Sequence, residues 1–152
     1  MSRIRRSLSA PPHLGLPRAK KTVIFGGGAM GCLWGSKLAK LPDMDVCIFT
    51  KWTAQREKIM ANGGIYLESI DGKVSLSPCI ASSSPDWIKN EFGLSDFGFV
   101  FVKSMKDTFT SGEIAKTLLR PGGLLISFQN GMGREEILTE ATDAKVRITV
   151  GT

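Results

Sequence analysis

The sequence predicts an α/β fold, a doubly wound and mainly parallel sheet with a small hairpin insertion, and three observations support it. Short β-branched or apolar runs alternate with segments of helical pattern, which implies right-handed crossovers between parallel strands. Residues 97–102 read FGFVFV, as expected for a strand buried on both faces. The chain has 152 residues, of which 42% are apolar and 22% charged, which fits one globular domain with a core.

The first half of this pattern begins with a strand at residues 22–25, a β-branched run that ends in glycines. A helix over 29–41 follows, because helix formers and small residues continue until Pro42 stops them. A second strand is predicted at 46–49. A second helix is predicted at 53–61, where Asn62-Gly63-Gly64 closes it.

A hairpin interrupts the alternation in the middle of the chain. Residues 65–68 and 74–77 alternate apolar and polar side chains around Asp71-Gly72, a typical two-strand turn signal. A short helix is predicted at 85–92, beginning with a proline.

The second half repeats the strand-and-helix order. After the buried strand at 97–102, a helical pattern runs over 108–119 and ends at Arg120-Pro121-Gly122-Gly123. The remaining predicted elements are a strand at 124–128, a helix at 134–141 and a last strand at 146–150.

Residues 1–21 differ in composition from the rest and are predicted to be a flexible basic arm. They contain six Lys or Arg and no acid, so they account for the net charge of +6 and leave 14 basic and 14 acidic residues beyond them. A neutral domain disfavours nucleic acid as a partner. The arm fits either an extension of a cytoplasmic protein or, being rich in Arg and Ser, a transit peptide for mitochondria or another organelle.

Several classes of chemistry are excluded by residue type. The single histidine, His13, lies in the arm, so the domain has no Ser-His or Cys-His pair and no histidine metal ligand. Cys32, Cys47 and Cys79 are far apart in sequence, which predicts neither a disulfide scaffold nor a zinc site, and no metal is expected. The longest uncharged apolar stretch, 23–35, is broken by glycines and too short to span a membrane.

A glycine-rich loop joins the first strand to the first helix and fits the pattern GxGxxG. In this context the pattern predicts a Rossmann-like dinucleotide site: Gly26 allows the turn, Gly28 lets a pyrophosphate approach, and Gly31 lets helix and strand pack closely. A glycine turn without a ligand is the alternative. The predicted cofactor-binding residues of the loop are Gly26, Gly27, Gly28, Ala29, Met30 and Gly31.

The end of the second strand predicts which dinucleotide binds. Binders of NAD usually carry an acid there, whereas this strand runs into Thr50-Lys51-Trp52. Lys51 suits a 2′-phosphate, so NADP(H) is favoured over NAD(H). The alternative is an ordinary solvated lysine at a strand end.

Two polar residues follow the strands of the second half. Lys103 and Asn130 fall at the carboxyl ends of parallel strands, where doubly wound sheets place ligands. A cation there attracts a carboxylate substrate, and an amide bridges hydroxyl and carbonyl groups. A solvated loop lysine and a turn-forming asparagine before Gly131 are the alternatives.

Together these residues resemble the N-terminal NADP-binding domain of ketopantoate reductase (2-dehydropantoate 2-reductase). The resemblance runs from about residue 22 to 152 and rests on the glycine loop, the basic residue after strand two, VFVK at 100–103 and QNGMG at 129–133. It implies NADPH-dependent reduction of 2-dehydropantoate to pantoate in pantothenate and coenzyme A biosynthesis. By position, Lys103 would lie at the cofactor and substrate cleft, and Asn130 would contact nicotinamide ribose and the 2-oxo acid. Met105 departs from the family, which commonly has an aromatic residue there.

The resemblance also implies a helical C-terminal domain, with a lysine general acid, that these 152 residues do not contain. No catalytic residue is therefore assigned, and we expect the chain to bind cofactor without turnover and to self-associate through the uncovered domain interface. A non-catalytic NADP-binding or regulatory module is the alternative function. A methyltransferase is a third, weakened by Lys51 where an acid is usual.

Overall fold

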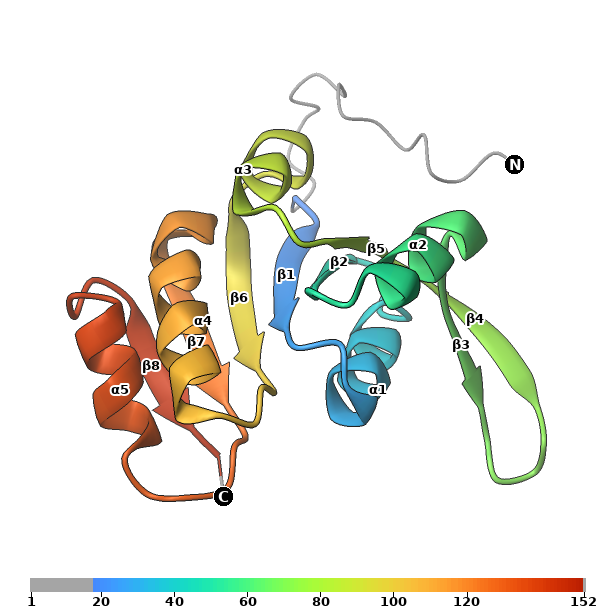
Figure 1. Ribbon diagram of the computed structural model, residues 1–152. Coiled ribbons are helices and arrows are strands. Elements are labelled where there is room, and N and C mark those ends of the chain that lie inside the picture. Colours follow the sequence, from blue (N-terminus) through green and yellow to red (C-terminus); the bar gives the residue numbers. More distant parts are fainter. Residues whose placement is uncertain (1–17, 152) are drawn as a thin grey trace.

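The computed structural model describes residues 18–151 and contains a six-stranded, all-parallel sheet and a separate antiparallel hairpin (Figure 1). The sheet order is β5-β2-β1-β6-β7-β8. Its strands are β1 (Lys20–Phe25), β2 (Met44–Phe49), β5 (Ile80–Ser82), β6 (Ser95–Val100), β7 (Leu119–Ser127) and β8 (Arg147–Val150). The hairpin consists of β3 (Gly64–Glu68) and β4 (Val74–Pro78). This is the doubly wound α/β fold that the sequence predicts.

Helices connect the parallel strands. They are α1 (Ala29–Leu38), α2 (Thr53–Asn62), α3 (Pro85–Trp87) with the π-helical turn η1 (Ile88–Phe92), α4 (Met105–Leu118) and α5 (Arg134–Ala141). The chain leaves β1 toward β2 and β5 on one side, and passes from β6 to β7 and β8 on the other. The carboxyl ends of β1 and β6 therefore lie side by side where the winding reverses, which is the usual ligand position in such sheets (Figure 1).

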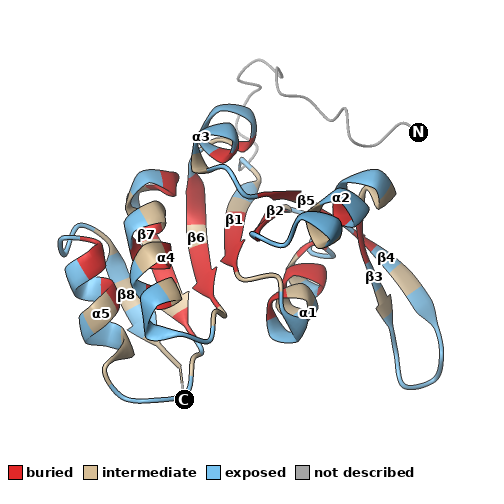
Figure 2. Ribbon diagram, in the orientation of Figure 1, coloured by how far each residue is buried: buried red, intermediate tan, exposed pale blue. Residues whose placement is uncertain are grey.

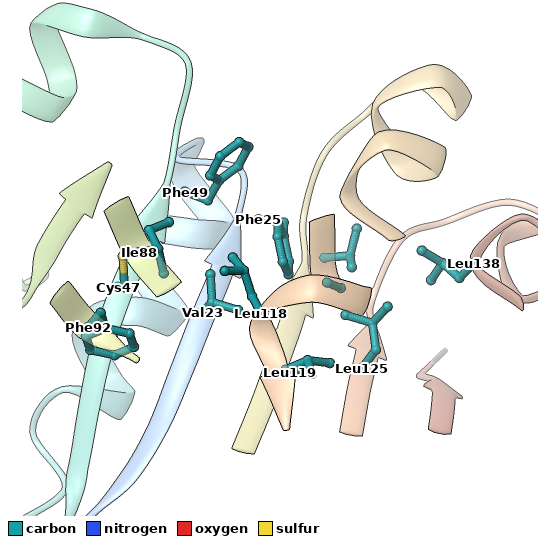
Figure 3. Close-up of a cluster of buried hydrophobic side chains, with 12 residues drawn as sticks. Val23, Phe25, Cys47, Phe49, Ile88, Phe92, Leu118, Leu119, Leu125 and Leu138 are labelled. Atoms are coloured by element: carbon teal, nitrogen blue, oxygen red, sulfur yellow. The ribbon is translucent and has the colours of Figure 1, made fainter. Parts of the chain in front are cut away.

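The central strands of the sheet are largely buried (Figure 2), and one hydrophobic cluster lies on each face of the sheet. Successive residues of β1 point to opposite faces, so Phe25 joins one cluster and Ile24 the other. Leu118 of α4 and Leu138 of α5 lie in the cluster that contains Phe25 (Figure 3). The cluster around Ile24 is closed by α1, α2 and β3. The first pair of crossover helices thus covers one face and the second pair covers the other.

Four aromatic rings, one of which belongs to α1, stack against one another. The ring centroids of Trp34 in α1 and of Phe128, which follows β7, are 5.2 Å apart, and the two ring planes differ by 11°. Phe99 of β6 and Phe101 lie within 6.4 Å of each other and are also stacked on Trp34. The stack joins the two halves of the fold.

The first strand begins earlier than predicted, so the basic arm does not extend to Lys21. Lys20 and Lys21 pair with Met44 and Asp45 of β2. Arg18 contacts Asp96 with Nη2 at 2.9 Å from Oδ1. The sequence does not predict this start, because the two lysines lie outside the apolar run that identifies the strand. The predicted arm and transit peptide otherwise fall on residues 1–17, outside the described residues.

Asp96 is the buried acceptor of these contacts, with its side chain 9% exposed at the amino end of β6. It accepts a hydrogen bond from the backbone N–H of Lys21 at 2.8 Å and pairs with Nε of Arg120 at 3.0 Å. Burial alone would raise the pKa of Asp96, but the Lys21 N–H and the charges of Arg120 and Arg18 outweigh it and lower the pKa.

Other element boundaries also shift. β5 was not predicted, because Ile80–Ser82 is a short strand, paired only with β2. β6 begins at Ser95, two residues early, and β7 begins at Leu119, with an irregular register where Pro121 and two glycines interrupt the pattern. α1 ends at Leu38 rather than at residue 41. α4 begins at Met105 rather than at 108 because Ser104 caps it.

Candidate functional site

The glycine loop follows β1 and opens α1, and three of its glycines have different surroundings. Gly26 has φ +107°, a value that side chains rarely adopt. A Cβ on Gly31 would lie 1.8 Å from the carbonyl oxygen of Gly26, whereas one on Gly28 would meet nothing within 4 Å. Gly28 is the N-cap of α1 and offers no side-chain acceptor, so the first amides of α1 remain available to an anion.

Gln55 of α2 braces this loop and was not found from the sequence. Its Nε2 donates to the carbonyl oxygen of Gly27, and its Oε1 accepts from Thr50 Oγ1 at 3.0 Å. A Cβ on Gly27 would lie 2.1 Å from Gln55 Oε1, so the glycine makes room for the amide. The interaction joins residues far apart in sequence, which is why no local pattern shows it.

A cleft of about 190 Å³ opens beside the loop, between the ends of β1 and β2 and the first turns of α4. Lys51 stands at its margin with its side chain 67% exposed, and Nζ lies 3.7 Å from Oδ1 of Asp107. The lining residues are Gly26, Phe49, Thr50, Lys51, Val102, Asp107, Thr110 and Ser111. The structure thus brings predicted Lys51 and Gly26 together and adds an acid from α4.

Asp107 is held in the first turn of α4 by the capping residue. Ser104 Oγ accepts from the N–H of Asp107 at 3.0 Å and donates to its Oδ2 at 2.6 Å. The hydrogen bond from Ser104 lowers the pKa of Asp107, and the charge of Lys51 lowers it further. Near neutral pH the cleft therefore has one cation and one carboxylate. The spacing Ser104-x-x-Asp107 is a helix-start signal that could have located this acid.

Lys103 and Asn130 follow the neighbouring strands β6 and β7, three residues beyond each strand end. Both are exposed at the edge of the sheet where the glycine loop lies. Within residues 18–151 neither side chain makes a hydrogen bond, so both are free to meet a ligand.

A polar network beneath them holds the two loops together. Gln129 donates from Nε2 to the carbonyl oxygen of Val102 and, at 2.8 Å, to Thr108 Oγ1. Arg134 donates to the same hydroxyl at 3.0 Å and to the carbonyl oxygen of Lys103 at 3.2 Å. Gln129 and Arg134 flank the asparagine-glycine motif in sequence, and their roles as loop ties were not predicted.

The described part of the chain offers few groups for metal binding or for cysteine chemistry. Among residues 18–151 no group of three His, Cys, Asp or Glu side chains is placed to hold a metal ion. The three cysteines are free; burial raises the pKa of Cys79 to about 12 and also raises that of Cys47. None of the described helices is long and apolar enough to cross a membrane.

The sheet order, the glycine loop at the head of α1 and the cleft at the point of reversal define a Rossmann-like domain of the dinucleotide-binding type. Residues 22–152 match the family described as ketopantoate reductase PanE/ApbA, and the chain belongs to that family.

Solved structures of several oxidoreductases share the fold of this chain. A PanE/ApbA family ketopantoate reductase from Ralstonia eutropha is 26% identical, with a TM-score of 0.65 over 86% of this chain and 39% of that chain. A protein from Enterococcus faecalis described as a putative 2-dehydropantoate 2-reductase is 23% identical, with a TM-score of 0.66 over 86% and 40%. A D-mandelate dehydrogenase, solved with NADH and anilino(oxo)acetate, is 20% identical, with a TM-score of 0.66 over 87% and 40%.

The chain thus spans about two-fifths of the length of these proteins. No curated protein sequence matches it.

Proposed function

We propose that this domain binds NADP(H) and forms the cofactor-binding part of a ketopantoate reductase-like oxidoreductase that reduces 2-dehydropantoate to pantoate. The observation that supports this most is Lys51 at the cleft, next to the glycine loop and at the strand end where NAD enzymes carry an acid. Family membership supports the same class of chemistry.

In this proposal the groups around the glycine loop have separate roles. The amides at the start of α1 bind the pyrophosphate, where the helix dipole favours negative charge. Lys51 binds the 2′-phosphate. Gln55 keeps the loop carbonyl of Gly27 turned away from the phosphates by donating to it.

Lys103 and Asn130 form the substrate side of the proposed site. The ammonium of Lys103 attracts the carboxylate of a 2-oxo acid, and the amide of Asn130 bonds to the nicotinamide ribose and the substrate. The bound cofactor supplies the hydride. Gln129 and Arg134 hold the two loops in register, so that these side chains face the same ligand. We assign no proton donor within these residues.

Titration of tryptophan fluorescence tests the cofactor assignment. Trp52 is 66% exposed and adjoins Lys51, so a dinucleotide in the cleft should quench its emission. NADPH, NADH and S-adenosylmethionine are compared in parallel, and NADPH should bind most tightly. Tightest binding of S-adenosylmethionine would favour a methyltransferase, and binding of none of the three would contradict the proposal.

The variant Lys51→Ala tests the role of the lysine. It should weaken NADPH binding by about 1–2 kcal/mol, the scale of a partly exposed charge-assisted contact, and leave NADH nearly unchanged. Lys58→Ala removes an exposed lysine of α2 outside this cleft and serves as the matched control. Equal losses for both cofactors would show that Lys51 does not contact the 2′-phosphate.

A further inference from the structure

The cleft contains a charge that works against the cofactor proposed for it. Of the residues that line it, Lys51 and Asp107 are the two that ionise, and they lie 3.7 Å apart. The 2′-phosphate of a dinucleotide therefore competes with this carboxylate for the ammonium of Lys51. The phosphate then remains near Asp107, because the lysine reaches both groups from one place.

The two members of the pair differ in mobility. Lys51 is 67% exposed, on a long flexible side chain, and can turn toward a ligand. Asp107 sits in the first turn of α4, where Ser104 bonds both its backbone N–H and its carboxylate. The acid therefore stays at the cleft when the lysine moves. A carboxylate held in place repels a phosphate of about −1.5 to −2 charge but not a ribose hydroxyl.

We propose that Asp107 is a cofactor-specificity residue that selects against the 2′-phosphate and so limits the preference for NADPH that Lys51 confers. This inference rests on the proposed dinucleotide function. The ratio of NADPH to NADH affinity is then set by a balance between the two residues. The sequence at the end of β2 alone overstates the preference, because the opposing acid comes from a different crossover.

The variant Asp107→Asn tests the inference with the 152-residue chain. Asparagine keeps an oxygen acceptor for Ser104 and removes the charge. We expect NADPH to bind about fivefold more tightly, the upper end for an exposed charge interaction, with NADH changed by less than about twofold. Adenosine 2′,5′-bisphosphate and 5′-AMP, which carry only the adenosine half, should show the same contrast. The gain should shrink as salt is raised, because the interaction is near the surface.

Asp71→Asn is the matched control. Asp71 also pairs with a lysine, Lys73 at 2.8 Å, but it lies in the turn of the β3–β4 hairpin, away from α4 (Figure 1). It produces the same change in net charge and should alter neither affinity. A melting temperature close to wild type for Asp107→Asn confirms that the cap of α4 is intact.

Each other outcome overturns the inference. An unchanged NADPH affinity, or an equal gain for both cofactors, shows that Asp107 does not sense the phosphate. Weaker NADH binding shows that the carboxylate is instead a ligand of the ribose hydroxyls. In these cases wild-type binding of NADPH leaves the proposed function standing. If wild type binds neither dinucleotide, both the function and the inference fail.

Discussion

Replacing Asp96 by asparagine removes the buried charge that joins the start of β1 to β6. The change keeps the size of the side chain and an acceptor for the N–H of Lys21, which lies 2.8 Å away. It leaves the guanidinium groups of Arg18 and Arg120, and the ammonium of Lys20 at 3.8 Å, without their counter-charge. The perturbation is therefore almost purely electrostatic.

The expected loss is about 2 kcal/mol in the free energy of unfolding. Removing one partner of a fully buried ion pair costs about 3–5 kcal/mol because the remaining charge is stranded. Here the cost is smaller, because Arg18 is 50% exposed and Arg120 29% exposed, so both can regain water. A loss of this size lowers the melting temperature of a domain of this length by about 4–8 °C.

Urea unfolding at pH 7, 5 and 3 is the assay. The pKa of Asp96 is lowered in the folded protein, so its contribution is present above the unfolded pKa, near 3.9, and is lost as pH falls through the folded pKa. The gap between wild type and Asp96→Asn should be full at pH 7 and shrink below about pH 4. A gap under about 0.5 kcal/mol at pH 7, or one that persists undiminished in acid, would refute the electrostatic account.

Three further predictions concern stability. A chain that begins at Thr22 should be about 2–3 kcal/mol less stable than one that begins at Arg18, because it loses the first ladder pairs of β1 as well as the Arg18 ion pair; comparing the two melting curves isolates these four residues. Gly31→Ala should cost at least about 3 kcal/mol in urea unfolding and abolish nucleotide binding, whereas Gly28→Ala, which faces open space, should fold like wild type. Gln129→Leu should cost about 2 kcal/mol by calorimetry, since it leaves the carbonyl oxygen of Val102 without its side-chain donor and removes one of the two donors to the Thr108 hydroxyl; equal stability would show that these hydrogen bonds contribute nothing.

The sheet and its winding could be predicted because the apolar runs are strong and regularly spaced. Residues 97–102 lie within two residues of β6, and the helix predicted at 134–141 has the bounds of α5. These elements are specified by burial, which a single sequence records in its hydrophobic pattern. The glycine loop could also be predicted, because the short spacing between its glycines is enough to specify its geometry.

The elements and site residues that were not predicted depend on contacts between residues distant in sequence. β5 has few apolar residues and forms because its backbone pairs in parallel with β2. Gln55 contacts the glycine loop, and Asp107 lines the cleft, only because the fold packs α2 against the loop and α4 beside Lys51. The polar residues that shape the site were therefore harder to find than the core.

The stack of aromatic rings couples the two ends of the proposed ligand. Trp34 belongs to α1, whose first turn is the proposed pyrophosphate site, and Phe128 lies two residues before Asn130. Because the rings of Phe99 and Phe101 also stack on Trp34, α1 and the loop after β7 share one aromatic cluster. In the proposed complex, this aromatic cluster would therefore fix the distance between the site for the pyrophosphate and the site for the nicotinamide ribose before substrate binds.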